Sequence, residues 1–179
     1  RRLKAEHPDW LLMGERHARR LPGFDLGNSP TEVEAADVAG RTIVHTTHAG
    51  TQGLRAATAA DEVLTGALVN AGAICRYLRR RRPALVSLVR MGHEAREPCA
   101  EDALCAELIR ARLEGRAFDL PRVRERLRVA PAAAKFFDPA AKWAPERDFE
   151  LCTAVDRFDF VLRLADRHGP LPWLEQVAA

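Results

Sequence analysis

The chain has 179 residues, of which 47% are hydrophobic and 30% are charged, a balance typical of a soluble globular protein. A formal net charge of +3 is too small to indicate a nucleic-acid-binding protein, and the lack of an apolar run of about 20 residues argues against a membrane-spanning helix. No Cys-x-x-Cys pair is present, which argues against a zinc or redox motif and predicts reduced thiols in a cytoplasmic protein. The four scattered cysteines are Cys75, Cys99, Cys105 and Cys152.

In chain order, the first predicted strand covers residues 10–13 and ends at Gly14-Glu15-Arg16. Residues 22–30 (Pro-Gly-Phe-Asp-Leu-Gly-Asn-Ser-Pro) then predict a shaped loop, because proline fixes φ and glycine frees it. Asp25 and Asn28 give this loop a carboxylate and an amide, which suit metal or phosphate binding. Ser29-Pro30-Thr31-Glu32 is typical of a helix start, with Ser29 as the N-cap and Glu32 closing a capping box.

The rest of the chain alternates apolar segments with helical patterns. Strands are predicted over residues 41–47, 61–66 and 84–90, and helices over 50–59, 70–80 and 98–115. The continuous apolar run at 84–90 is typical of a strand buried on both faces of a parallel sheet. Towards the end we predict helices over 119–128 and 131–137, a proline-rich connection over 138–145, a final strand over 156–162, and a tail packed by Trp173 and Leu174.

This order of elements predicts an α/β fold. We expect a mainly parallel sheet with flanking helices in three layers, and a more helical C-terminal third. The chain should form a single unit, with a possible sub-boundary near residues 116–145.

Thr46-Thr47-His48-Ala49-Gly50-Thr51 lies where a predicted strand ends and a helix begins. Such turns can bind anions, because free backbone N–H groups and the helix dipole point to one spot, and threonine hydroxyls can add donors. In an open parallel sheet this edge is also where ligands bind. A plain strand-to-helix turn with a glycine for curvature would have the same pattern.

Gly14-Glu15-Arg16, the loop at 22–30 and a Thr-Thr-x-x-Gly-Thr turn, in this order, resemble the 2-phosphosulfolactate phosphatase family. The resemblance implies a magnesium-dependent phosphatase of the coenzyme M pathway, which converts 2-phosphosulfolactate and water to sulfolactate and phosphate. The family normally has further sequence upstream, so we expect the chain to lack an N-terminal segment.

The common family form of the turn reads Thr-Thr-Thr-Asn-Gly-Thr, whereas this chain has His48 and Ala49. Two alternatives therefore stay open: a phosphatase acting on another small phosphate, and a non-catalytic protein that binds a small anion. The expected partner is a small-molecule phosphate ester, with no nucleic acid and no membrane, and a homodimer is possible.

With this resemblance, Mg²⁺ is the expected cofactor and Glu15 and Asp25 are its expected ligands, because Mg²⁺ prefers hard oxygen donors. A salt bridge of Glu15 with Arg16 or Arg19, and capping of its own loop by Asp25, are the alternatives. The residues expected to bind substrate are Asn28, Thr46, Thr47, His48, Gly50, Thr51 and Asn70.

The expected catalytic residues are Glu101, Asp102 and Arg16. The pattern Glu101-Asp102-Ala103-Leu104-Cys105 matches the family, and an acid among Glu101, Asp102 and the N-terminal part that we expect the chain to lack would orient the attacking water. The helix dipole alone also favours acids in a first turn. Arg16 would pair with the sulfonate or carboxylate of the substrate. Asn70, for its part, could simply cap the helix that follows it.

Overall fold

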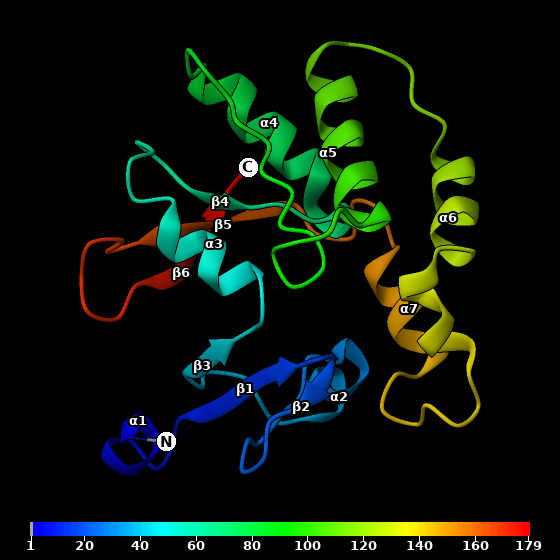
Figure 1. Ribbon diagram of the computed structural model, residues 1–179. Helices are drawn as coiled ribbons and strands as arrows, with labels where there is room; N and C mark the ends of the chain where they lie inside the picture. Colours follow the sequence, from blue (N-terminus) through cyan, green and yellow to red (C-terminus); the bar gives the residue numbers. More distant parts are fainter. Residues whose placement is uncertain (1) are drawn as a thin grey trace.

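The computed structural model describes residues 2–179 (Figure 1). Its elements, in chain order, are α1 (Arg2–Glu6), β1 (Leu11–Arg16), β2 (Arg19–Arg20), α2 (Pro30–Ala35), β3 (Ile43–Thr46), α3 (Gly50–Ala56), β4 (Leu64–Thr65), the 3₁₀ helix η1 (Leu68–Asn70), α4 (Ala71–Arg81), α5 (Ala100–Leu113), α6 (Leu120–Arg128), the 3₁₀ helix η2 (Pro131–Phe137), α7 (Glu146–Cys152), β5 (Phe160–Ala165) and β6 (Trp173–Ala178).

The strands form two separate three-stranded sheets. In the first, ordered β2-β1-β3, β1 runs parallel to β3 and antiparallel to β2. The second, ordered β4-β5-β6, is antiparallel throughout. The prediction of one mainly parallel sheet in three layers was therefore wrong. Apolar periodicity identifies strands but not their partners, and β5 is paired on both edges by antiparallel neighbours.

The apolar segment at 84–90 forms no strand, contrary to the prediction. Leu85 and Val89 face solvent, being 82% and 75% exposed, whereas Leu88 packs partly buried against the core. A buried strand needs neighbours that satisfy its backbone N–H and C=O groups. An apolar run cannot supply those neighbours by itself.

Most predicted helices are present because their signals are local. The cores of α4, α5 and α6 fall inside the predicted ranges, and the hydroxyl of Ser29 accepts a hydrogen bond from the N–H of Glu32 at 3.2 Å, as expected of an N-cap. The carboxylate of Glu32 does not complete the capping box; it accepts from the N–H of Gly27 at 2.6 Å. Residues 131–137 form a 3₁₀ helix, and the last predicted strand begins four residues later than expected, at Phe160.

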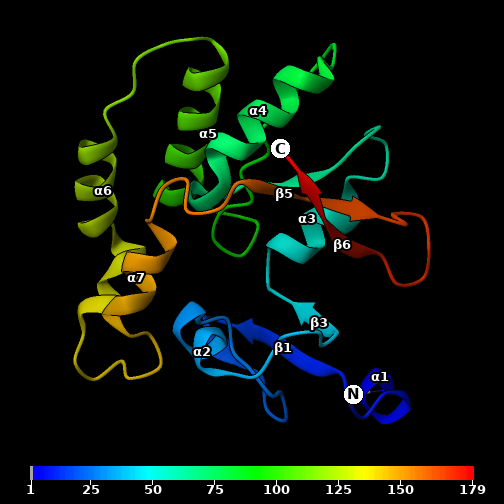
Figure 2. The ribbon, with the colours of Figure 1, turned by 180° about the vertical axis from the view of Figure 1, so that it is seen from behind.

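The main hydrophobic core lies where α4 packs on both α5 and β5 (Figure 2). Tyr77, Leu104, Leu108 and Val161 are all less than 3% exposed there. The tail joins the second sheet as β6, although Trp173 remains 55% exposed. Over residues 2–179, no helix combines the length and the apolar character that a membrane crossing requires.

The first sheet is attached to the helical part through α2 and α7, which lie side by side in both ribbon views. The buried carboxylate of Asp148 on α7 accepts hydrogen bonds from the hydroxyl of Ser29 and the N–H of Thr31, both at 2.9 Å. This contact anchors the C-terminal end of the 22–30 loop to α7.

Candidate functional site

Glu15 joins two of the motifs at the ends of parallel strands β1 and β3. One carboxylate oxygen accepts from the N–H of His48 at 2.8 Å, and the other accepts from the N–H of Ala18 at 3.0 Å. A carboxylate bound to two backbone donors makes strong, charge-assisted hydrogen bonds. Glu15 therefore holds the turn after β1 against the turn after β3.

The turn after β3 is closed by its own threonines. The N–H of Thr47 donates to the hydroxyl of Thr51, and the N–H of Thr51 donates to the hydroxyl of Thr47, each at 3.1 Å. The hydroxyl of Thr51 also donates to the carbonyl of Thr47 at 3.1 Å. Gly50 begins α3, and Thr46 pairs with Gly14 of β1. The N–H groups of Thr47, His48 and Thr51 thus have protein acceptors in this state.

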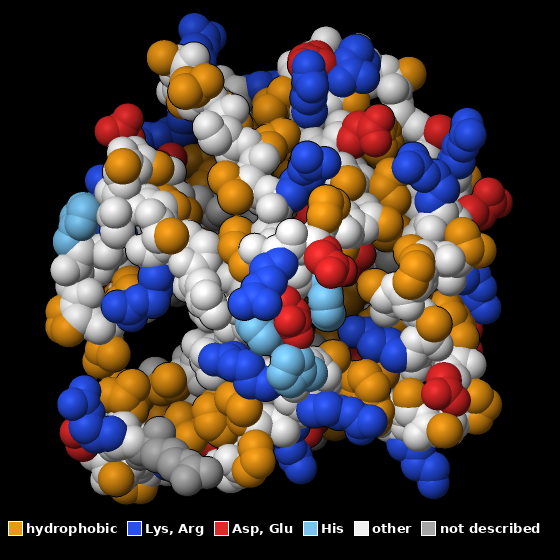
Figure 3. All heavy atoms as spheres, viewed as in Figure 1, with side chains coloured by type: hydrophobic (Ala, Val, Ile, Leu, Met, Phe, Trp, Pro, Cys, Tyr) orange, Lys and Arg blue, Asp and Glu red, His pale blue; other side chains and the backbone are white. Residues whose placement is uncertain are grey.

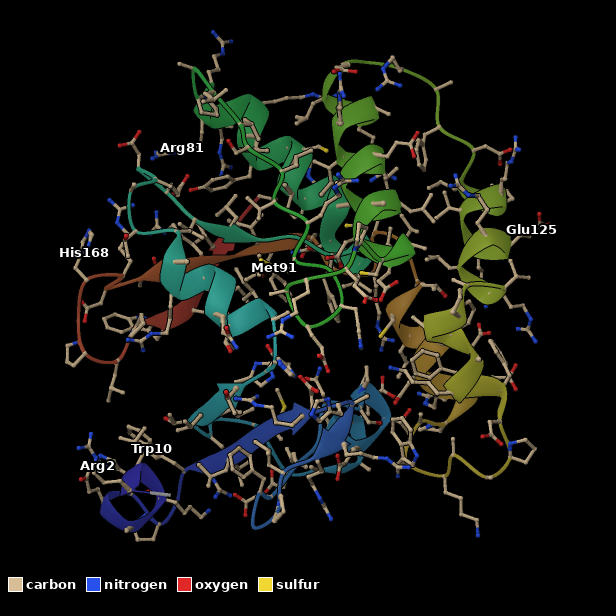
Figure 4. All side chains as sticks on the ribbon, viewed as in Figure 1. Arg2, Trp10, Arg81, Met91, Glu125 and His168 are labelled. Carbon is tan, nitrogen blue, oxygen red and sulfur yellow. The ribbon has the colours of Figure 1, made fainter. Side chains whose placement is uncertain are left out.

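The start of α5 reaches the same region through the loop at 91–97. A carboxylate oxygen of Asp102 accepts from the N–H of Gly92 at 2.7 Å. Met91, labelled in Figure 4, lies against α3, where a Cβ on Gly53 would come within 2.3 Å of its sulfur. The structure therefore links Asp102, through this loop, to the turn at residues 46–51, which we call the threonine turn.

Glu101, the neighbouring acid, is exposed at the first turn of α5. Burial raises the pKa of the nearby Cys99 thiol to about 12. Burial also raises the pKa of Cys105 to about 11. Both thiols therefore stay protonated at neutral pH and make poor nucleophiles.

Three side chains from separate loops meet beside the threonine turn. Nδ1 of His17 lies 2.7 Å from Oε1 of Glu94, and Nδ1 of His48 lies 3.9 Å from the same oxygen. Figure 3 shows histidine side chains gathered around acidic ones near the middle of this face. The hydrogen bond to His17 is the largest cause that holds the pKa of Glu94 below its usual range. Sequence reasoning missed His17 and Glu94, because 77 positions separate them and no local pattern connects them.

The structure does not bring Asp25 to Glu15. A carboxylate oxygen of Asp25 accepts from the N–H of Leu12 at 2.8 Å and from Nζ of Lys4 at 3.2 Å. The Leu12 bond is the main reason that the pKa of Asp25 lies below its usual range. Leu12 lies three residues before Glu15, which is roughly 10 Å along a strand. At this separation the two carboxylates do not fit one Mg²⁺ shell.

Asn28 and Arg16 lie near the same sheet but make local contacts. The side-chain oxygen of Asn28 is 3.1 Å from Nε2 of His45 on β3. The guanidinium of Arg16 donates to the carbonyl of Glu15 at 2.8 Å. Arg16 is the last residue of β1, and its remaining N–H groups are free of that bond and can bind an anion.

Asn70 ends η1, next to β4 of the second sheet, and does not belong to this cluster. Its side chain is 5% exposed, and its oxygen accepts from the N–H of Ala67 at 3.0 Å, which shapes η1. A surface hollow of about 640 Å³ also lies at this sheet, along β5, β6 and the turn between them. It contains none of the expected site residues, so the geometry around Glu15 is the better candidate for the chemistry.

The comparisons with known proteins all indicate the same family. The family model described as 2-phosphosulpholactate phosphatase matches residues 1–167. A "Probable 2-phosphosulfolactate phosphatase" of Deinococcus radiodurans is 47% identical over 90 residues, which cover 50% of this chain and 38% of that protein. One of Caldanaerobacter subterraneus is 44% identical over 71 residues, covering 40% of this chain and 30% of the relative.

A longer alignment is found with the protein of the same description from Thermotoga petrophila. It is 30% identical over 175 residues, covering 92% of this chain and 74% of the relative. The alignments with the Caldanaerobacter and Deinococcus proteins span well under half of those relatives. The family match nevertheless extends over nearly all of the sequence and includes both motifs that Glu15 connects. The chain belongs to the 2-phosphosulpholactate phosphatase family.

Proposed function

We propose that the protein is a phosphatase that hydrolyses a small acidic phosphate monoester, with 2-phosphosulfolactate as the first candidate substrate. The observation that carries the proposal is the 2.8 Å hydrogen bond between Glu15 and the N–H of His48. It joins two motifs, more than 30 residues apart, at the carboxyl ends of parallel strands, where ligands bind in α/β sheets. The descriptions of the relatives support the same activity.

Hydrolysis needs compensation of the charge on the phosphoryl group and a positioned water. The ester P–O bond of the substrate breaks, and the water oxygen bonds to phosphorus. The leaving-group oxygen takes a proton from that water. In this proposal the hydroxyls of Thr47 and Thr51 donate to phosphate oxygens. Thr47 does so while it accepts from the N–H of Thr51, and Thr51 gives up its bond to the carbonyl of Thr47. Arg16 binds the second acidic group of the substrate.

The two acids of α5 take different roles in this proposal. Asp102 is committed to the N–H of Gly92 and positions the 91–97 loop. Glu101 is exposed and is the better candidate to orient the water. Mg²⁺ is implied by the family resemblance, but Glu15 and Asp25 do not fit a shared site for it, so we assign it no step. A role in coenzyme M synthesis is part of the proposal and is supported by the family resemblance. A cytoplasmic location is part of it as well and is supported by four free cysteines.

The test is phosphate release by the purified protein from 2-phosphosulfolactate and from phospholactate. We expect turnover of the sulfonate-bearing ester, and weaker binding by about 1–3 kcal/mol in Thr47→Ala, which removes a hydroxyl that donates to the charged phosphate. Thr58→Ala, an exposed threonine just after α3, is the matched control and should behave as wild type.

Turnover of phospholactate alone would replace the substrate but keep the reaction. Retained binding of these esters with no phosphate release from either would overturn the proposal in favour of a small-anion-binding protein.

A further inference from the structure

Three nitrogen and oxygen donors converge beside the threonine turn. His17 follows β1, His48 follows β3, and Glu94 lies on the loop between α4 and α5. One ligand atom from each lies within 4.8 Å of the other two. Residues that are distant in sequence thus present their donors to one point.

A second observation points to a ligand at this place. Nδ1 of His48 is buried and has no hydrogen-bond partner among the described residues. A buried polar atom without a partner costs free energy and calls for an explanation. The nearest charged oxygen, Oε1 of Glu94, lies 3.9 Å away, too far for a hydrogen bond and close enough to share an ion.

The loops that carry these side chains are held from outside the cluster. Glu15 binds the N–H groups of Ala18 and His48, and Asp102 binds the N–H of Gly92. The loops are thus held by these backbone bonds in addition to the 2.7 Å contact between His17 and Glu94. The donors are therefore positioned by the scaffold and remain available to an ion.

We propose that His17, His48 and Glu94 bind one divalent transition-metal ion of the Zn²⁺ class. Two imidazole nitrogens and one carboxylate oxygen are a donor set typical of zinc sites, whereas Mg²⁺ prefers oxygen donors. Tetrahedral bonds of about 2.0–2.2 Å put donor atoms roughly 3.3 Å apart. The present contacts of 2.7 and 3.9 Å bracket that separation, so small side-chain rotations suffice.

Three protein ligands leave a fourth position open, as in zinc sites that bind water or substrate. His48 directly follows Thr47, so that position lies next to the threonine turn. Metal binding at this site is independent of the proposed phosphatase activity and is measured without a substrate.

The test is Zn²⁺ binding by the metal-free protein, measured by competition with a chromophoric chelator. We expect one ion per chain, and binding weaker by at least about tenfold in Glu94→Gln and in His17→Ala, since even the loss of an outer-shell partner costs that much. Glu94→Gln keeps the side-chain shape, and His17 is 72% exposed, so both variants should fold, as circular dichroism will show. His168→Ala, an exposed histidine in the β5–β6 turn, is the matched control and should bind Zn²⁺ as wild type does.

Co²⁺ provides a readout of geometry, because four-coordinate Co²⁺ has a strong visible spectrum. We expect this spectrum with wild type and its loss in His17→Ala. Equal Zn²⁺ affinity in wild type and both ligand variants would overturn the proposal. Competition by Mg²⁺ at the same concentration as Zn²⁺ would overturn it as well.

Discussion

Replacing Glu15 by glutamine should loosen the two turns at the ends of β1 and β3. The carboxylate now accepts from two backbone donors, at 2.8 Å from His48 and 3.0 Å from Ala18. A glutamine offers one oxygen, so one N–H loses its acceptor and faces an amide NH₂ group. Hydrogen bonds to charged groups contribute about 1.5–3 kcal/mol. Because Glu15 is half-buried, we expect Glu15→Gln to lose about 1–2 kcal/mol of the free energy of unfolding.

The assay is urea denaturation combined with hydrogen exchange. The unfolding midpoint should fall, and exchange at the amides of His48 and Ala18 should speed up by more than exchange in the core helices α4 and α5, whose rates follow global unfolding. Glu107→Gln is the matched control: this glutamate is exposed on α5, and no side-chain partner is found for it within residues 2–179. An unchanged midpoint with unchanged exchange at both amides would refute the assignment of Glu15 as the connector of the two turns.

Two further predictions concern packing and pH. Gly14→Ala should destabilise the first sheet by about 1–3 kcal/mol, because the new Cβ would lie 2.3 Å from the carbonyl oxygen of Thr46. Thermal unfolding checks this prediction. The control is Gly66→Ala, which should be tolerated because its Cβ would meet atoms no closer than 3.6 Å. Asp156→Asn should lower stability at pH 7 by about 1–2 kcal/mol, a figure reduced for the partial exposure of the pair, because Asp156 forms a two-point ion pair with Arg112 at 2.8 and 2.7 Å. That pair is the main cause that lowers the pKa of Asp156, so its stabilisation is present above the unfolded-state pKa and is lost as the pH falls through the lower folded-state value. Urea titrations should therefore show the difference between wild type and variant shrinking below about pH 4, and a difference that grows on acidification would contradict the argument.

The sequence by itself predicted the elements whose bonds are local. Helix hydrogen bonds join residues four apart, so the apolar spacing of α4 and α5 and the N-cap at Ser29 could be recognised without a partner. The family motifs could be recognised for the same reason, since each occupies a few consecutive residues. Comparison with known proteins confirmed the family that these motifs indicated.

Only the tertiary structure decided which distant segments meet. Strand pairing depends on a second chain segment, and for this reason the apolar run at 84–90 did not become a strand and the sheet was not one parallel layer. The sequence does not distinguish the carboxylates of Glu15 and Asp25. In the structure, however, Glu15 accepts from the N–H of His48 beyond the end of β1, whereas Asp25 accepts from the N–H of Leu12 near its start. His17, His48 and Glu94 carry no common pattern, because they come together only when three loops fold onto one another. Contacts between such loops depend on long-range packing, which short sequence windows do not contain.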